Sequence, residues 1–76
     1  MAFTANDYRE ALAALDLTQS GAAKLLGVDA RTSRRWATGE RDVPPPAERF
    51  LRFLIAAKIK PERVMRLLVA GDGGTG

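Results

Sequence analysis

A single tryptophan has three arginines close to it in the stretch GVDARTSRRWATGE, which contains Trp36 and Arg31, Arg34 and Arg35. A guanidinium group carries a permanent positive charge and a planar fork of N–H donors, so it pairs with carboxylates, phosphates or the acceptor edges of bases. No acidic residue lies between Asp29 and Glu40 to neutralise these groups locally. The stretch therefore indicates either an anion-binding surface or the solvated face of a basic helix.

The residue types used most in catalysis are missing. The chain has neither cysteine nor histidine, which excludes disulfides, thiolate metal ligands and the usual general base at neutral pH. It contains no phosphate-binding glycine-rich loop with Lys and Ser or Thr, and no HExxH. The DGG near the C-terminus resembles part of a calcium loop but lacks the other ligands. We therefore expect no enzyme activity, no catalytic residue, no metal, no cofactor and no small-molecule ligand.

Size and composition favour one small cytoplasmic domain. The 76 residues carry 12 Lys and Arg against 9 Asp and Glu, a net charge of +3, which is modest until its distribution is known. The longest mainly apolar stretch, residues 50–59, contains Arg52 and Lys58 and is shorter than the roughly 20 residues that cross a bilayer. The N-terminus lacks the basic and apolar regions of a secretory signal.

The elements that must position the arginines are short helices. Thr4 and Asp7 form a capping-box pattern ahead of an apolar stripe of period 3.6, which predicts a first helix. Thr18 predicts the start of a second helix over residues 19–26, and Gly27 its end, because glycine adopts positive φ at little cost.

Asp29 is placed to cap a third helix over residues 30–38 by accepting from the amide near Thr32, and Gly39 ends that helix. The three-residue connection 27–29 is typical of two helices that cross steeply. This helix carries all three arginines.

Prolines mark the last two helices. The three prolines at 44–46 predict a loop, and they can also form the first turn of a fourth helix from about Pro45 to Lys58. Pro61 starts a fifth helix to about Ala70, and the tail, residues 71–76, is expected to be disordered. The fold class is therefore all-α, with about five short helices.

The segment TQSGAAKLLGVDARTSRRWATGERDVP resembles the helix-turn-helix of the Cro and phage-repressor type of DNA-binding domain. The resemblance is carried by Gln19, Ala23, Leu26, Gly27, Val28 and Trp36. Ala23 permits close approach of the two helices, while Val28 and Trp36 fill the angle between them. The resemblance extends over roughly residues 6–54 and implies a lambda-repressor-like domain over residues 1–70, with its motif at 18–38.

In this family the second helix of the motif reads the major groove and the first crosses the DNA backbone. The resemblance implies base contacts from Ala30, Arg31, Arg34 and Arg35. It implies backbone contacts from Thr18, Gln19, Ser20, Lys24, Thr38 and Arg41. Two alternatives stay open: Arg35 and Thr38 could equally contact phosphate, and Arg41 could instead pair with Glu40 or Asp42.

One residue departs from the family pattern. Ser33 stands where an inward Val or Ile is usual, so its buried hydroxyl needs a partner, most simply a carbonyl one turn back in its own helix. On that basis Ser33→Val is expected to be neutral or stabilising.

The fourth helix has a wider apolar face than a small core requires, and the fifth adds more apolar residues. These predict a homodimer surface made of Phe53, Ile55, Ile59, Val64, Leu67 and Leu68. The alternative is that the fifth helix covers the fourth within one chain.

The resemblance implies a transcriptional regulator that binds double-stranded DNA, most plausibly a repressor on an inverted-repeat operator, of a kind common in phages and mobile elements. The competing interpretation is a protein-interaction module, for example an antitoxin-like one, in which the arginines bind an acidic protein and the helix-turn-helix is only a scaffold.

Overall fold

Five helices follow one another in the part of the chain that the structure describes. The structure is a computed structural model that describes residues 3–75, and the side chains of residues 3–69. The helices are α1 (Ala5–Ala14), α2 (Gln19–Leu26), α3 (Ala30–Thr38), α4 (Pro45–Ala57) and α5 (Pro61–Thr75). Residues 3–75 contain no strand, which confirms the predicted all-α fold class. No helix in this part of the chain is long and apolar enough to cross a membrane.

The predicted capping residues set the starts of the first two helices. The Thr4 hydroxyl accepts from the Asp7 amide at 3.0 Å, and the Asp7 carboxylate accepts from the Thr4 amide at 2.9 Å. Thr18 accepts from the Gly21 amide at 2.9 Å. Helix α2 ends at Gly27, whose φ of 72° lies in the left-handed region. Local hydrogen bonds therefore place these ends as the sequence predicts.

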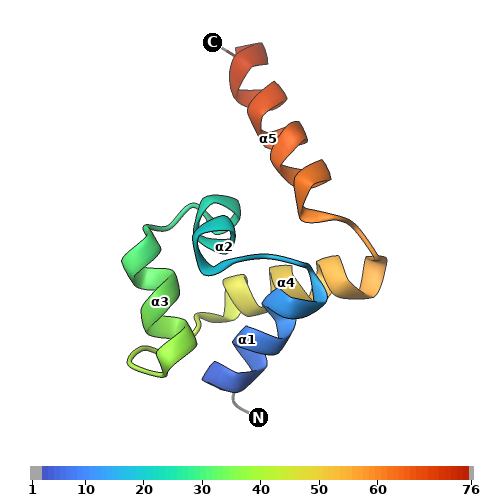
Figure 1. Ribbon diagram of the computed structural model, residues 1–76. Helices are drawn as coiled ribbons and strands as arrows, with labels where there is room; N and C mark the ends of the chain where they lie inside the picture. Colours follow the sequence, from blue (N-terminus) through green and yellow to red (C-terminus); the bar gives the residue numbers. More distant parts are fainter. Residues whose placement is uncertain (1–2, 76) are drawn as a thin grey trace.

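Helices α1 to α4 form a body with one apolar core, and α5 projects away from it (Figure 1). The core is centred on Tyr8, Leu12, Trp36, Leu51 and Leu54, all of them buried. The Tyr8 and Trp36 rings meet edge to face, with centroids 5.7 Å apart and an interplanar angle of 84°, an arrangement that aromatic pairs favour. This contact packs α1 against α3.

A chain of hydroxyl groups crosses this core. Ser33 is fully buried, and its hydroxyl donates to the backbone carbonyl of Gln19 at 2.9 Å. Because that bond uses the only hydroxyl proton of Ser33, the Tyr8 hydroxyl, 2.7 Å away, must be the donor to the Ser33 oxygen. We call this Tyr8–Ser33–Gln19 chain the hydroxyl relay; it joins α1, α3 and α2.

The relay corrects the prediction that Ser33 bonds one turn back in its own helix. Its acceptor is instead a carbonyl in the first turn of α2. Ala22 and Ala23 are both buried there, and their small side chains let the two helices approach closely enough for the bond. Ser33 is thus a tertiary contact, and the expectation that Val is neutral or stabilising at this position no longer holds.

The last two helices differ from the predicted bounds. Helix α4 ends at Ala57, and Lys58 follows with φ 57°, a left-handed conformation that is unusual for lysine. Helix α5 continues past Gly71 to Thr75: glycine permits a helix to stop but does not oblige it to. The side chains of residues 70–76, and Gly76 altogether, lie outside the described part, so the disorder of the tail stays a prediction.

We predict that Ser33→Val lowers the free energy of unfolding by about 2 kcal/mol, because it leaves the Tyr8 hydroxyl without a partner inside the core and removes the hydrogen bond that joins α3 to the Gln19 carbonyl of α2. Tyr8→Phe should cost less, since the Ser33 bond to Gln19 survives. In denaturant titrations the double variant should lose less free energy of unfolding than the sum of the losses of the two single variants. Additive losses, or full stability of Ser33→Val, would contradict the relay.

The relay also predicts a dependence of stability on alkaline pH. Burial raises the pKa of the Tyr8 hydroxyl above its ordinary value. Because the folded pKa lies above the unfolded value of about 10, the stabilisation is complete below that value and is lost as pH rises through the folded pKa. The free energy of unfolding, measured by denaturant titration from pH 8 to 11.5, should therefore fall more steeply with pH for the native chain than for Tyr8→Phe. Parallel curves would contradict this assignment.

Candidate functional site

Helix α3 begins at a charged cap. The Asp29 carboxylate accepts from the Thr32 amide at 2.7 Å, as the sequence predicts. This hydrogen bond lowers the pKa of Asp29, and the positive charges of Arg31 and Arg35 lower it further. The helix ends at Gly39, with φ 86°. Both ends of the arginine-bearing helix are therefore defined by local interactions.

The two sides of α3 differ completely. Ser33, Trp36 and Ala37 are buried and face the body, which confirms Trp36 as a core residue. The opposite side is exposed and consists of Ala30, Arg31, Arg34 and Thr38. At about 100° per residue these four fall on one arc of the helix. We call them the exposed arc; its charge comes entirely from arginine.

Arg35 lies at the edge of this arc and is half-buried. Its guanidinium group is 3.6 Å from the Glu40 carboxylate, and the Arg41 amide donates to the Arg35 carbonyl at 3.3 Å. Glu40 thus pairs with Arg35, whereas the Arg41 side chain is exposed. Of the three arginines, Arg31 and Arg34 extend most freely into solvent.

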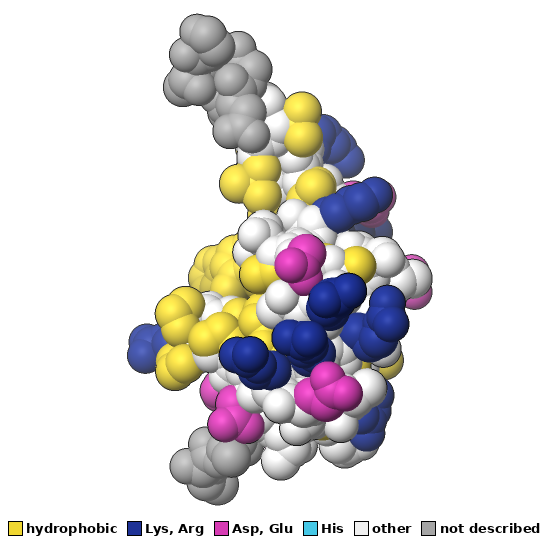
Figure 2. All heavy atoms as spheres, turned by 90° about the vertical axis from the view of Figure 1, so that its left-hand side faces the viewer, with side chains coloured by type: hydrophobic (Ala, Val, Ile, Leu, Met, Phe, Trp, Pro, Cys, Tyr) yellow, Lys and Arg dark blue, Asp and Glu magenta, His cyan; other side chains and the backbone are white. Residues whose placement is uncertain are grey.

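Figure 2 views the molecule from the side on which α3 lies in Figure 1, and cationic side chains gather over this face. Acidic side chains also lie on this face, but α3 itself contains none. Such a face attracts anions by charge and offers planar, forked donors for pairing with them.

The predicted backbone contacts on α2 do not all lie together. Gln19 and Ser20 are exposed at its first turn, beside Thr18, whose hydroxyl caps the helix. The Gln19 carbonyl belongs to the hydroxyl relay, which holds this turn against the middle of α3. Lys24 instead lines a groove between α2 and α5. The structure thus brings Gln19 and Ser20 close to α3 and directs Lys24 elsewhere.

Arg9 also positions α3, a role that no pattern in the sequence indicates. Its guanidinium group donates to the backbone carbonyl of Ala37 in the last turn of α3. A cation at a helix C-terminus satisfies a free carbonyl and opposes the helix dipole. Arg9 is separated from Ala37 by 28 positions, so no local pattern could have identified the pair.

The six apolar residues predicted for dimerisation do not form one surface. Phe53 and Ile55 are exposed but stand two positions apart on α4, so they point in nearly opposite directions. Ile59 and Val64 are half-buried and pack against the core, whereas Leu67 and Leu68 are exposed on the projecting part of α5. Helix α5 therefore covers the body only at its base.

Among the residues whose side chains are described, no group of three or more carboxylates could hold a metal ion.

Comparison with known proteins gives no match: no family model, no curated protein and no solved structure resembles this chain closely enough to be significant.

We predict that the charge of Asp29 stabilises α3 only above acid pH. Because its folded pKa is lowered, the stabilisation is present above the unfolded value of about 3.9 and is lost as pH falls through the folded value. Asp29→Ala should lower the melting temperature by several degrees at pH 7, and by much less at pH 2.5. Asp29→Asn keeps an acceptor but has no charge, so its melting temperature at pH 7 should lie between those of the native chain and Asp29→Ala. Equal losses at both pH values would exclude the charge as the cause.

Proposed function

We propose that the chain is a sequence-specific double-stranded DNA-binding protein of the helix-turn-helix type, acting as a transcriptional regulator and most simply as a repressor that occupies a promoter. The observation that carries the proposal is the exposed arc of α3. Two free arginines project from a helix whose opposite side is fixed by Trp36 and the hydroxyl relay. A rigid helix with an arginine arc is suited to the major groove, where Arg pairs bidentately with guanine.

In this proposal Arg31 and Arg34 contact base edges, and Ala30 contacts a thymine methyl group. Arg35, held beside Glu40, and Thr38 contact phosphates together with Arg41. The first turn of α2 supplies Gln19 and Ser20, whose free amides and side chains meet the DNA backbone. Lys24 is left out, because it lines the groove beside α5.

We further propose that two copies associate through the projecting part of α5. Leu67 is 67% exposed and Val69 64% exposed, with Leu68 beside them, which is more apolar surface than an isolated helix in water favours. A two-fold pair would present two α3 helices to successive major grooves about 34 Å apart, and so would select an inverted repeat.

Selection from a random duplex library tests the proposal, with Arg34→Ala, Gln19→Ala and the control Arg49→Ala compared on the recovered site. Arg34→Ala should cost about 1–3 kcal/mol on that site and little on random DNA, whereas Gln19→Ala should weaken both alike. Arg49 is exposed on α4, so its loss removes the same charge outside the proposed contact. Binding by the native chain should also fall steeply with salt.

Failure to enrich any sequence would exclude specific DNA recognition and favour an interaction module. Equal losses on specific and random DNA would assign Arg34 to phosphate. An enriched single half-site would retain DNA reading and exclude the dimer.

A further inference from the structure

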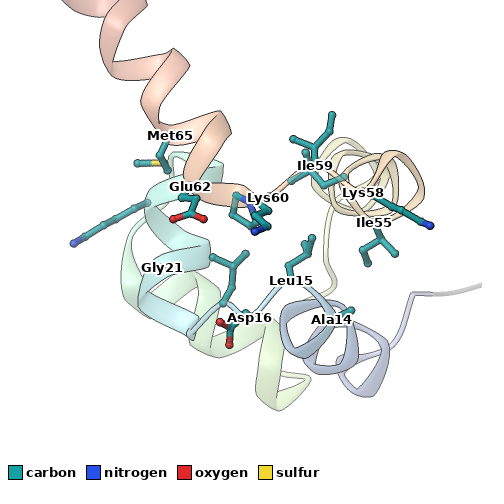
Figure 3. Close-up of a pocket in the computed structure, with 14 residues that line it drawn as sticks. Ala14, Leu15, Asp16, Gly21, Ile55, Lys58, Ile59, Lys60, Glu62 and Met65 are labelled. Atoms are coloured by element: carbon teal, nitrogen blue, oxygen red, sulfur yellow. The ribbon is translucent and has the colours of Figure 1, made fainter.

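A groove of about 650 Å³ lies beneath the base of α5, between α2 and the C-terminal end of α4. Its apolar lining comes from four parts of the chain and includes Leu15, Leu17, Leu54, Ile55, Ile59 and Met65. In Figure 3 Leu15, Ile55 and Ile59 lie on one side and Met65 on the other, with Lys60 between them. The proposed DNA contacts on α3 contribute no residue to this groove.

The rim of the groove is mainly cationic. Lys24, Lys58 and Lys60 line it, and the last two also line an adjoining hollow with Arg63 and Arg66. Among the residues whose side chains are described, the acidic ones that line the two depressions are Asp16 and Glu62. Five cations against two carboxylates make this a second positive region, built on different helices from the first.

The lining does not suit a small polar ligand. Among the described residues, every buried side-chain nitrogen or oxygen already has a hydrogen-bond partner. Small-molecule sites usually present a few convergent polar groups that fix the orientation of the ligand. Here the groove offers an aliphatic surface with charges at its edges, which is the pattern that receives the apolar stripe of a helix.

A second copy of this chain fits the groove poorly. Over residues 61–69 helix α5 carries Arg63 and Arg66 against the single carboxylate of Glu62, so its insertion would bring those arginines toward Lys58 and Lys60. Like charges placed together across an interface oppose association. Nucleic acid fits poorly as well, because its phosphate backbone would leave the aliphatic lining uncovered.

We propose that this groove binds an acidic amphipathic helix of another protein, with its apolar stripe against Ile55, Ile59 and Met65 and its carboxylates beside Lys58 and Lys60. The interaction is separate from the exposed arc of α3, so the partner and DNA can be bound at the same time. Binding of the helix in this groove does not depend on the α3 surface being a DNA reader.

The test uses the full chain and a fluorescein-labelled 18-residue helical peptide with leucines at i, i+3, i+4 and i+7 and glutamates on its other face. We expect fluorescence anisotropy to show binding at least tenfold tighter than for a peptide of the same composition without the stripe, or for one with Lys in place of Glu. Ile55→Ser, at a position 39% exposed, and Lys60→Glu should each weaken binding at least fivefold. Arg49→Glu, the matched charge reversal outside the groove, should leave it unchanged.

Circular dichroism checks that each variant is folded. If Ile55→Ser does not fold, the test of the groove rests on Lys60→Glu, which is at an exposed position. Equal binding of the peptide with the apolar stripe and the peptide of the same composition without it would overturn the proposal, because binding would then depend only on nonspecific charge attraction. Loss of self-association in Ile55→Ser, measured by sedimentation without peptide, would assign the groove to a second copy. Loss of duplex binding in Lys60→Glu with peptide binding intact would assign it to nucleic acid.

Discussion

The hydroxyl relay from Tyr8 through Ser33 to the Gln19 carbonyl is the constraint on which the arrangement of the helices depends. It places one polar atom from each of α1, α3 and α2 in the core, where an unpaired group would cost about 1–3 kcal/mol. Three helices must therefore meet in one geometry for both hydroxyl groups to be satisfied. Apolar contacts among the same helices would tolerate small rotations, whereas hydrogen bonds of 2.7 and 2.9 Å do not.

That geometry determines what α3 presents to solvent. With Ser33 bonded inward and the ring of Trp36 against that of Tyr8, Arg31 and Arg34 can only project outward. Arg9 adds a second restraint at the other end of the helix by donating to the Ala37 carbonyl. The proposed reading surface is therefore held on its inner side by polar contacts from α1, a helix that contributes no proposed DNA contact.

The helix ends could be predicted because their causes are local. Thr4, Thr18 and Asp29 each cap amides within three residues, and Gly27 and Gly39 adopt positive φ directly after a helix. The division of α3 into two sides followed from its periodicity. The partner of Ser33 did not follow, because its acceptor lies 14 residues away in another helix, and sequence spacing carries no information on such contacts. The surplus of apolar residues on α4 was visible in the sequence. The sequence did not indicate that Ile55 lines a groove while Phe53 does not, because this depends on where α5 leaves the body.

The relay also bears on the order in which the molecule assembles. Helix α3 has nine residues, fewer than the roughly 12–15 that a helix needs to persist alone in water. The contact between Tyr8 and Ser33 closes a loop spanning 25 positions, and the entropy of that closure must be offset before the contact stabilises anything. Helix α3 consequently gains its stability from packing against both α1 and α2. The arginine arc therefore depends on the formation of the core on the other side of its helix.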